Sequence, residues 1–158
     1  MRRQALHLIP VKLWCSTPPA LDVSPTRLTF GGVPLLTPIE QSVVVSNNGS
    51  TPLLLTSASV ASVDGATVDL VNPLSGNTVL AVGESREFTV RVTAQSAGDF
   101  ESEFVVESDD PVLPQAKATL AAHSGPRIDP SAAGVLFCGA ETKVVTLVNT
   151  GTTTAAIN

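Results

Sequence analysis

The sequence predicts an all-β protein: an antiparallel β-sandwich of about seven strands, followed by an incomplete second copy. Three observations lead to this prediction. The apolar fraction of 43% consists mainly of valine, leucine and alanine, and 12 prolines and 11 glycines interrupt the chain. No window carries the sustained apolar stripe of an amphipathic helix. Short segments of alternating apolar and polar residues instead recur about every ten residues, as strands joined by turns do.

Alternation is clearest in three segments, residues 86–94, 99–108 and 115–122. Because successive side chains of a strand point to opposite faces, each segment predicts one buried face and one solvated face. The predicted buried residues are Phe88, Val90, Val92 and Ala94 in the first segment, Phe100, Phe104 and Val106 in the second, and Ala116, Ala118 and Leu120 in the third.

Four further strands are predicted at residues 26–30, 41–47, 52–60 and 66–71. About seven short strands over some 100 residues are typical of an immunoglobulin-like sandwich. Residues 95–98 have the length of a hairpin connection, and we interpret Asn48-Gly49-Ser50 as a hairpin turn rather than a glycosylation site, because Asn and Gly accept positive φ. Segments 26–30 and 115–122 are the candidate edge strands, where a partner strand could add.

Charge is distributed unevenly along the chain, whose net charge is −5. Residues 1–19 carry +3, residues 20–125 carry −8 from four basic and twelve acidic residues, and residues 126–158 are neutral. An acidic body without a basic patch argues against nucleic-acid binding. The two histidines, His7 and His123, lie outside the predicted strands, so no general base is predicted there, and we expect no enzymatic activity.

The first 20 residues are predicted to be a disordered leader or tether. A basic start, an apolar stretch and then Cys15 suggest a bacterial lipoprotein signal with Cys15 lipidated, although Trp14 stands where a small residue is expected. No segment has the apolar length of a transmembrane span. Cys15 and Cys138 have no metal-ligand spacing, and whether they pair stays open.

An internal repeat is present. Residues 21–32 match residues 128–139, with Phe30 falling on Phe137 and Gly32 on Gly139. After a five-residue deletion, residues 43–49 match residues 145–151, so that Asn47 falls on Asn149. A fixed period of this kind indicates tandem domains. We therefore predict a domain at residues 21–125 and the first strands of a second, truncated repeat at residues 126–158.

These residues carry a family resemblance. The segments "SPTRLTFGGVP", "QSVVVSNNGSTPLLL", "LAVGESREFTVRVTAQSAGDFESEFVVESDDP" and "ATLAAHSG", in this order, resemble the ASH-type immunoglobulin-like domain of the abnormal-spindle and hydin proteins. That domain is related in fold to major sperm protein and also occurs in tandem in bacterial choice-of-anchor envelope proteins. The chain departs from the family pattern at Val82-Gly83, where Pro-Gly is frequent, and at Cys138, where Gly is usual.

The resemblance implies a non-enzymatic structural, scaffold or adhesion module that binds proteins, including neighbouring repeats, through sandwich loops or strand edges. It supplies no active-site residues and no cofactor. The first expectation for location is the bacterial envelope or secretion. The alternative is a cytoplasmic targeting scaffold of cilia or microtubules.

A carbohydrate- or calcium-binding module is the alternative from another class. Asp109 and Asp110 are weak calcium candidates, because oxygen-rich junctions between domains can hold Ca²⁺. The low aromatic content of 4% disfavours a sugar site. If the second repeat stays incomplete, its strands need partners, which predicts self-association through residues 127–158.

Overall fold

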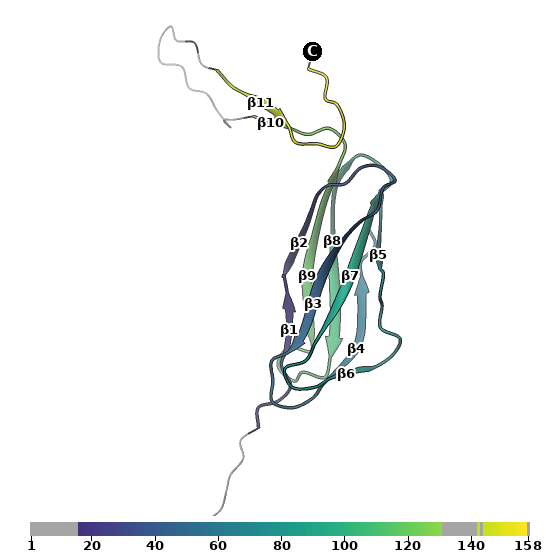
Figure 1. The fold of residues 1–158 in the computed structure, drawn as a ribbon, viewed down its shortest axis with the longest axis vertical. Coiled ribbons are helices and arrows are strands. Elements are labelled where there is room, and N and C mark those ends of the chain that lie inside the picture. Colours follow the sequence, from purple (N-terminus) through teal and green to yellow (C-terminus); the bar gives the residue numbers. More distant parts are fainter. Residues whose placement is uncertain (1–15, 131–141, 143, 158) are drawn as a thin grey trace, which may run out of the picture.

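The structure, a computed structural model, describes residues 16–130, 142 and 144–157. They form an elongated two-layer sandwich with a separate strand pair beyond one end (Figure 1). The chain leads into β1 at the opposite end of the sandwich (Figure 1). Among the described residues there is no helix with the length and apolarity of a membrane span.

The sandwich consists of a four-stranded and a five-stranded sheet. The first has the order β1 (Leu21–Ser24), β3 (Ile39–Asn47), β7 (Ser85–Ala94), β5 (Ala66–Leu70). The second has the order β2 (Arg27–Gly32), β9 (Gln115–Ser124), β8 (Gly98–Ser108), β4 (Leu53–Val60), β6 (Thr78–Leu80). Neighbouring strands are antiparallel except β2 and β9, which are parallel. The strand pair beyond the sandwich is β10 (Ile128–Pro130) with β11 (Leu147–Asn149).

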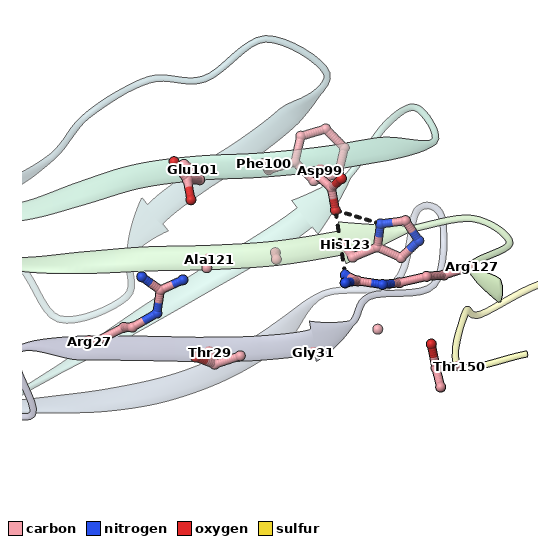
Figure 2. Close-up of a pocket in the computed structure, with 12 residues that line it drawn as sticks. Arg27, Thr29, Gly31, Asp99, Phe100, Glu101, Ala121, His123, Arg127 and Thr150 are labelled. Atoms are coloured by element: carbon pink, nitrogen blue, oxygen red, sulfur yellow. Dashed lines mark hydrogen bonds and ion pairs between the residues drawn. The ribbon is translucent and has the colours of Figure 1, made fainter. Parts of the chain in front are cut away.

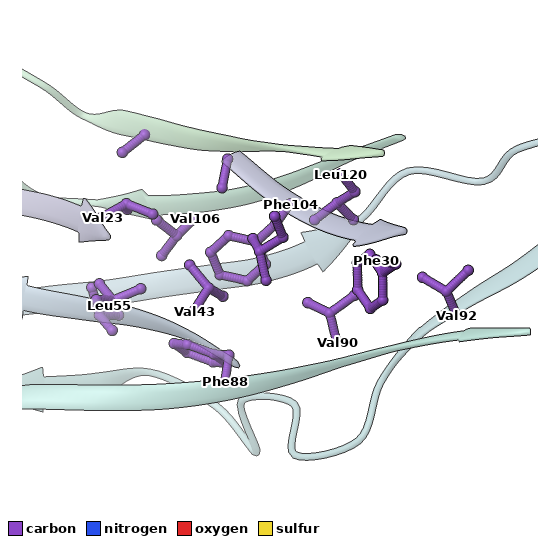
Figure 3. Close-up of a cluster of buried hydrophobic side chains, with 14 of the residues drawn as sticks. Val23, Phe30, Val43, Leu55, Phe88, Val90, Val92, Phe104, Val106 and Leu120 are labelled. Atoms are coloured by element: carbon purple, nitrogen blue, oxygen red, sulfur yellow. The ribbon is translucent and has the colours of Figure 1, made fainter. Parts of the chain in front are cut away.

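The core lies between the two sheets and is mostly aliphatic (Figure 3). Phe88 from β7 and Phe104 from β8 are fully buried and meet across the layers, with their ring centroids 5.4 Å apart. Burying one such side chain stabilises the fold by about 1.5–3 kcal/mol before conformational entropy is subtracted. All the inward-facing residues predicted on segments 86–94, 99–108 and 115–122 are buried. The predicted all-β, immunoglobulin-like sandwich is therefore confirmed.

Some details of the sequence-based prediction are wrong. Segment 115–122 is not an edge strand, because β9 lies between β2 and β8, whereas segment 26–30 does lie at a sheet edge. The connections at residues 48–52 and 95–97 are not hairpins, because each joins strands of different sheets. Alternation shows which side chains face inward, but it does not show which sheet a strand joins. The short strands β1 and β6 were missed, and β9 extends to Ser124.

Candidate functional site at the end of the sandwich

An open trough of about 560 Å³ lies on the outer face of the five-stranded sheet, next to the second strand pair (Figure 2). Its floor consists of small residues, including Gly31 on β2 and Ala121 on β9. Arg27 and Glu101 contribute opposite charges on the two sides of Ala121 (Figure 2). A trough with charges of both signs over a small-residue floor suits a polar chain segment better than an apolar ligand.

One end of the trough contains a histidine–carboxylate pair. His123 Nδ1 lies 2.8 Å from Asp99 Oδ1, and Arg127 Nη1 lies 3.9 Å from the same oxygen (Figure 2). His123 Nε2 is buried and has no hydrogen-bond partner among the described residues. A nucleophile activated by this imidazole would have to hydrogen-bond to Nε2. The pair is therefore not part of a catalytic triad within the described chain.

The sequence did not predict this pair, because His123 lies just beyond the predicted strand segment 115–122. The structure places His123 in β9, directly across from Asp99 in β8. The sequence does predict strands at residues 99–108 and 115–122. Aligning them as an antiparallel pair, with Glu107 opposite Gln115, brings Asp99 opposite His123.

The second strand pair is held by a turn that closes over its linker. Asn149 Nδ2 donates to Thr153 O at 2.9 Å, and Asn149 Oδ1 accepts from Gly151 N at 3.1 Å. The backbone N–H of Thr152 then donates to Gly125 O at 2.8 Å. We call this arrangement, residues 125–127 with residues 149–153, the second clasp.

The same arrangement occurs at the start of the sandwich. Asn47 Nδ2 donates to Thr51 O at 2.8 Å, and Asn47 Oδ1 accepts from Gly49 N at 3.0 Å and from Ala20 N at 3.3 Å. We call residues 17–20 with residues 47–51 the first clasp. The backbone bond from Asn48 N to Ala20 O has its counterpart in the bond from Thr150 N to Arg127 O, both at 2.8 Å.

Both clasps contain a glycine that touches the linker backbone. A Cβ on Gly49 would overlap Pro18 O and lie 2.6 Å from Ala20 N, and a Cβ on Gly151 would overlap Gly125 O. Neither Asn48 nor Gly49 has a positive φ. The expected positive φ at this turn is therefore wrong: the glycine is needed for close approach, not for a left-handed backbone.

The second clasp also contacts the end of the sandwich. A Cβ on Gly32 would lie 2.7 Å from Thr152 Cγ2, so the methyl group of Thr152 packs directly against this glycine. A Cβ on Gly125 would lie 2.9 Å from Ala97 Cβ in the β7–β8 connection. Small residues on both sides therefore allow the clasp to sit close to the sandwich.

Asp109 and Asp110, the weak calcium candidates, accept hydrogen bonds from the backbone. Asp109 Oδ1 accepts from Leu54 N at 2.8 Å. The buried Asp110 accepts from Leu21 N at 2.7 Å through Oδ2 and from Val112 N at 2.8 Å through Oδ1. The N–H of Leu21 is the main cause that lowers the pKa of Asp110 below its usual value.

No group of three or more potential metal ligands converges within the described residues. The proposed lipidation site Cys15 and its possible disulfide partner Cys138 both lie outside the described residues.

The comparisons with known proteins agree with this architecture. Residues 19–123 match the model of the HYDIN/CFA65/VesB-like, Ig-like domain. Because this match spans more than half of the chain, the protein belongs to that family of immunoglobulin-like domains. A comparison with curated proteins found no match.

Among solved structures, the chain is similar to the ASH/PapD-like domain 7 of human CEP192. The two share 15% identity and a TM-score of 0.53, over 78% of this chain and 96% of that one. It is also similar to a protein of unknown function from Porphyromonas gingivalis W83, with 19% identity and a TM-score of 0.53. That match covers 70% of this chain and 49% of the other. At these identities the similarity shows the shared fold.

Proposed function

We propose that the protein is a non-enzymatic scaffold or adhesion module in which immunoglobulin-like units follow one another along the chain and bind protein partners. The observation that carries this proposal is the repeated clasp. Asn47 and Asn149 make equivalent hydrogen bonds to their turns, and both turns close over a linker that leads into a strand, Leu21–Ser24 or Ile128–Pro130.

The strand pair β1–β3 beside the first clasp corresponds to the strand pair β10–β11 beside the second clasp. β1 pairs with β3 so that Leu21 lies opposite Asn47, and β10 pairs with β11 so that Ile128 lies opposite Asn149. Both pairs are antiparallel. This correspondence supports assigning residues 126–158 to the opening strands of a second unit, held in one orientation by the second clasp. A scaffold needs such fixed geometry between its units.

Amide hydrogen exchange, followed by NMR on the intact chain, tests this proposal. The amide of Thr152 should be protected, because it donates to Gly125 O. Gly151→Ala should remove this protection, because its Cβ overlaps the linker, while amides in β7 and β8 keep theirs. An unprotected Thr152 amide in the wild-type chain would contradict the proposal.

We place the module in the bacterial envelope or outside the cell, and a ciliary or microtubule-associated scaffold is the alternative. Support comes from the basic start of the leader and the Cys15 that follows its apolar stretch. The test is to fuse residues 1–25 to a reporter in a bacterial host. Export would exclude the cytoplasmic alternative, and retention would contradict the envelope assignment.

We also propose that the protein associates with itself through residues 127–158. Val145 and Leu147 are 38% and 47% exposed, whereas their counterparts Val43 and Val45 are fully buried between the sheets. Exposed apolar side chains favour association. Light scattering on the intact chain should show a mass that rises with concentration, and Leu147→Lys should reduce this rise. A monomer at every concentration would contradict self-association.

A further inference from the structure

Three of the four edge strands of the sandwich have a side chain hydrogen-bonded to their backbone. At β1, Asp110 Oδ2 accepts from Leu21 N at 2.7 Å. At β2, Gln41 Nε2 donates to Thr29 O at 2.8 Å. At the end of β6, Asn47 Nδ2 donates to Leu80 O at 3.2 Å. Such contacts occupy backbone groups that another strand would otherwise use.

The fourth edge strand, β5, has no such side-chain contact over residues 67–70. Gly65 O accepts from Gln95 N, and Val71 N donates to Thr89 O. In an antiparallel ladder the residues alternate between facing the partner strand and facing away. The N–H and C=O groups of Val68 and Leu70 therefore point away from β7, toward the open edge.

The neighbouring edge of the other sheet is also partly open. β6 pairs with β4 only at Leu53–Leu55, so no described strand pairs with the outer edge of Ser57–Val60. β5 contacts β4 across the layers, which places both open edges on the same side of the sandwich. Six half-buried apolar side chains of β4, β5 and the connections on either side of β5 pack against the core: Ala58, Val60, Val63, Val68, Leu70 and Leu74.

The charged side chains on β4, β5, β6 and the connections between them are all acidic. Arg91 on the neighbouring β7 lies opposite Asp69 and is paired with Glu40 at 2.7 Å, and Arg86 donates to Pro73 O at 3.2 Å. No lysine, arginine or histidine occurs between Arg27 and Arg86. Asp64, in the β4–β5 connection, and Asp69, on β5, are exposed. Lysines commonly protect edge strands against pairing, and this edge has none.

We propose that the β5 edge is a docking site for an extended, basic β-strand of a partner protein. The strand pairs with the outward backbone groups of Val68 and Leu70. Its inward apolar side chains cover the half-buried residues of β5 and β4, and its lysines or arginines lie near Asp64 and Asp69. This inference rests on the proposed function as a protein-binding module and names the surface and the chemistry of the partner.

Titration of the isotope-labelled chain with synthetic peptides tests the inference. The probe is the capped peptide Lys-Val-Lys-Val-Thr-Val-Lys, and the control replaces each lysine with glutamate. The basic peptide should shift the amide resonances of Val68, Leu70, Ala58 and Val60, and the acidic control should bind at least about fivefold more weakly. No shifts, shifts centred elsewhere, or equal affinity for the two peptides would overturn it.

Two variants sharpen the test. Val68→Pro removes the outward N–H and keeps the inward ladder of β5 and β7, so the fold should persist while peptide binding is lost. Asp69→Lys should weaken binding of the basic peptide and strengthen binding of the acidic one. Unchanged affinities in either folded variant would overturn the docking site. The Thr152 amide exchange is independent of this edge, so failure of the inference and failure of the proposed function give different results.

Discussion

Replacing Asn47 with alanine should destabilise the sandwich strongly. The Asn47 side chain is fully buried and connects three segments of the chain. Its Nδ2 group donates to Thr51 O at 2.8 Å and to Leu80 O at 3.2 Å, and its Oδ1 atom accepts from Gly49 N at 3.0 Å and from Ala20 N at 3.3 Å. Alanine would remove all of these bonds at once.

The loss of unfolding free energy depends on how deeply the backbone groups that lose Asn47 as a partner are buried. The bond to Leu80 O is buried, so losing it costs about 1–3 kcal/mol. The bonds to Thr51, Gly49 and Ala20 are partly buried and together add about 1–2 kcal/mol, because water can replace some of them. The free energy of unfolding should therefore fall by about 3 kcal/mol, which corresponds to a decrease in Tm of roughly 10–20 °C for a domain of this size.

Urea denaturation followed by far-UV circular dichroism measures this change. Asn149→Ala is the matched control, because Asn149 makes the equivalent bonds in the second clasp, but they are exposed. The control should change the unfolding free energy of the sandwich by less than about 0.5 kcal/mol. A loss below about 1 kcal/mol for Asn47→Ala, or equal losses for the two variants, would refute this reasoning.

Three other predictions concern the sandwich. Phe104→Ala should lower the unfolding free energy by about 3–5 kcal/mol in the same assay, because the fully buried ring packs against Phe88, and a loss near zero would contradict the core described here. Asp110 has a lowered pKa, so its contribution to stability is present at neutral pH and is lost as the pH falls from about 5 through the folded-state pKa. The variant Asp110→Asn should therefore show a flatter dependence of Tm on pH in that range than the wild-type chain. An unchanged dependence would argue against this role. Calcium should leave Tm unchanged because Asp109 and Asp110 already accept backbone N–H groups, and a rise in Tm with calcium concentration would show binding to the folded state.

Much of the sandwich could be predicted from the sequence because alternation is a direct consequence of strand geometry. Phe88, Val90 and Val92 repeat every second residue, and all three are buried. The sheet assignment of each strand could not be predicted in this way, since a strand has the same alternation in either sheet. The short strand Thr78–Leu80 shows too little alternation to be recognised.

The Asp99–His123 pair and the two clasps depend on strand register and on close approach of backbone segments. Neither property can be read directly from a single sequence. The pairing of Asp99 with His123 follows only when two predicted strands are aligned. The repeat aligns Asn149 with Asn47, but it does not show that both side chains close a turn over a linker. The role of Gly49 could not be predicted from the sequence, because it comes from the close approach to Pro18 and not from the local backbone conformation.

Residual dipolar couplings measured on the intact chain in one alignment medium test the central claim most directly. The claim is that a second strand pair is fixed to the immunoglobulin-like sandwich through the second clasp. Amides of β3 and β7 define the alignment of the sandwich, and amides of Ile128 and Thr152 report on the second strand pair and its clasp. The account predicts that a single alignment tensor fits both sets. A separate tensor for the second strand pair, or couplings there that are averaged toward zero, would contradict it.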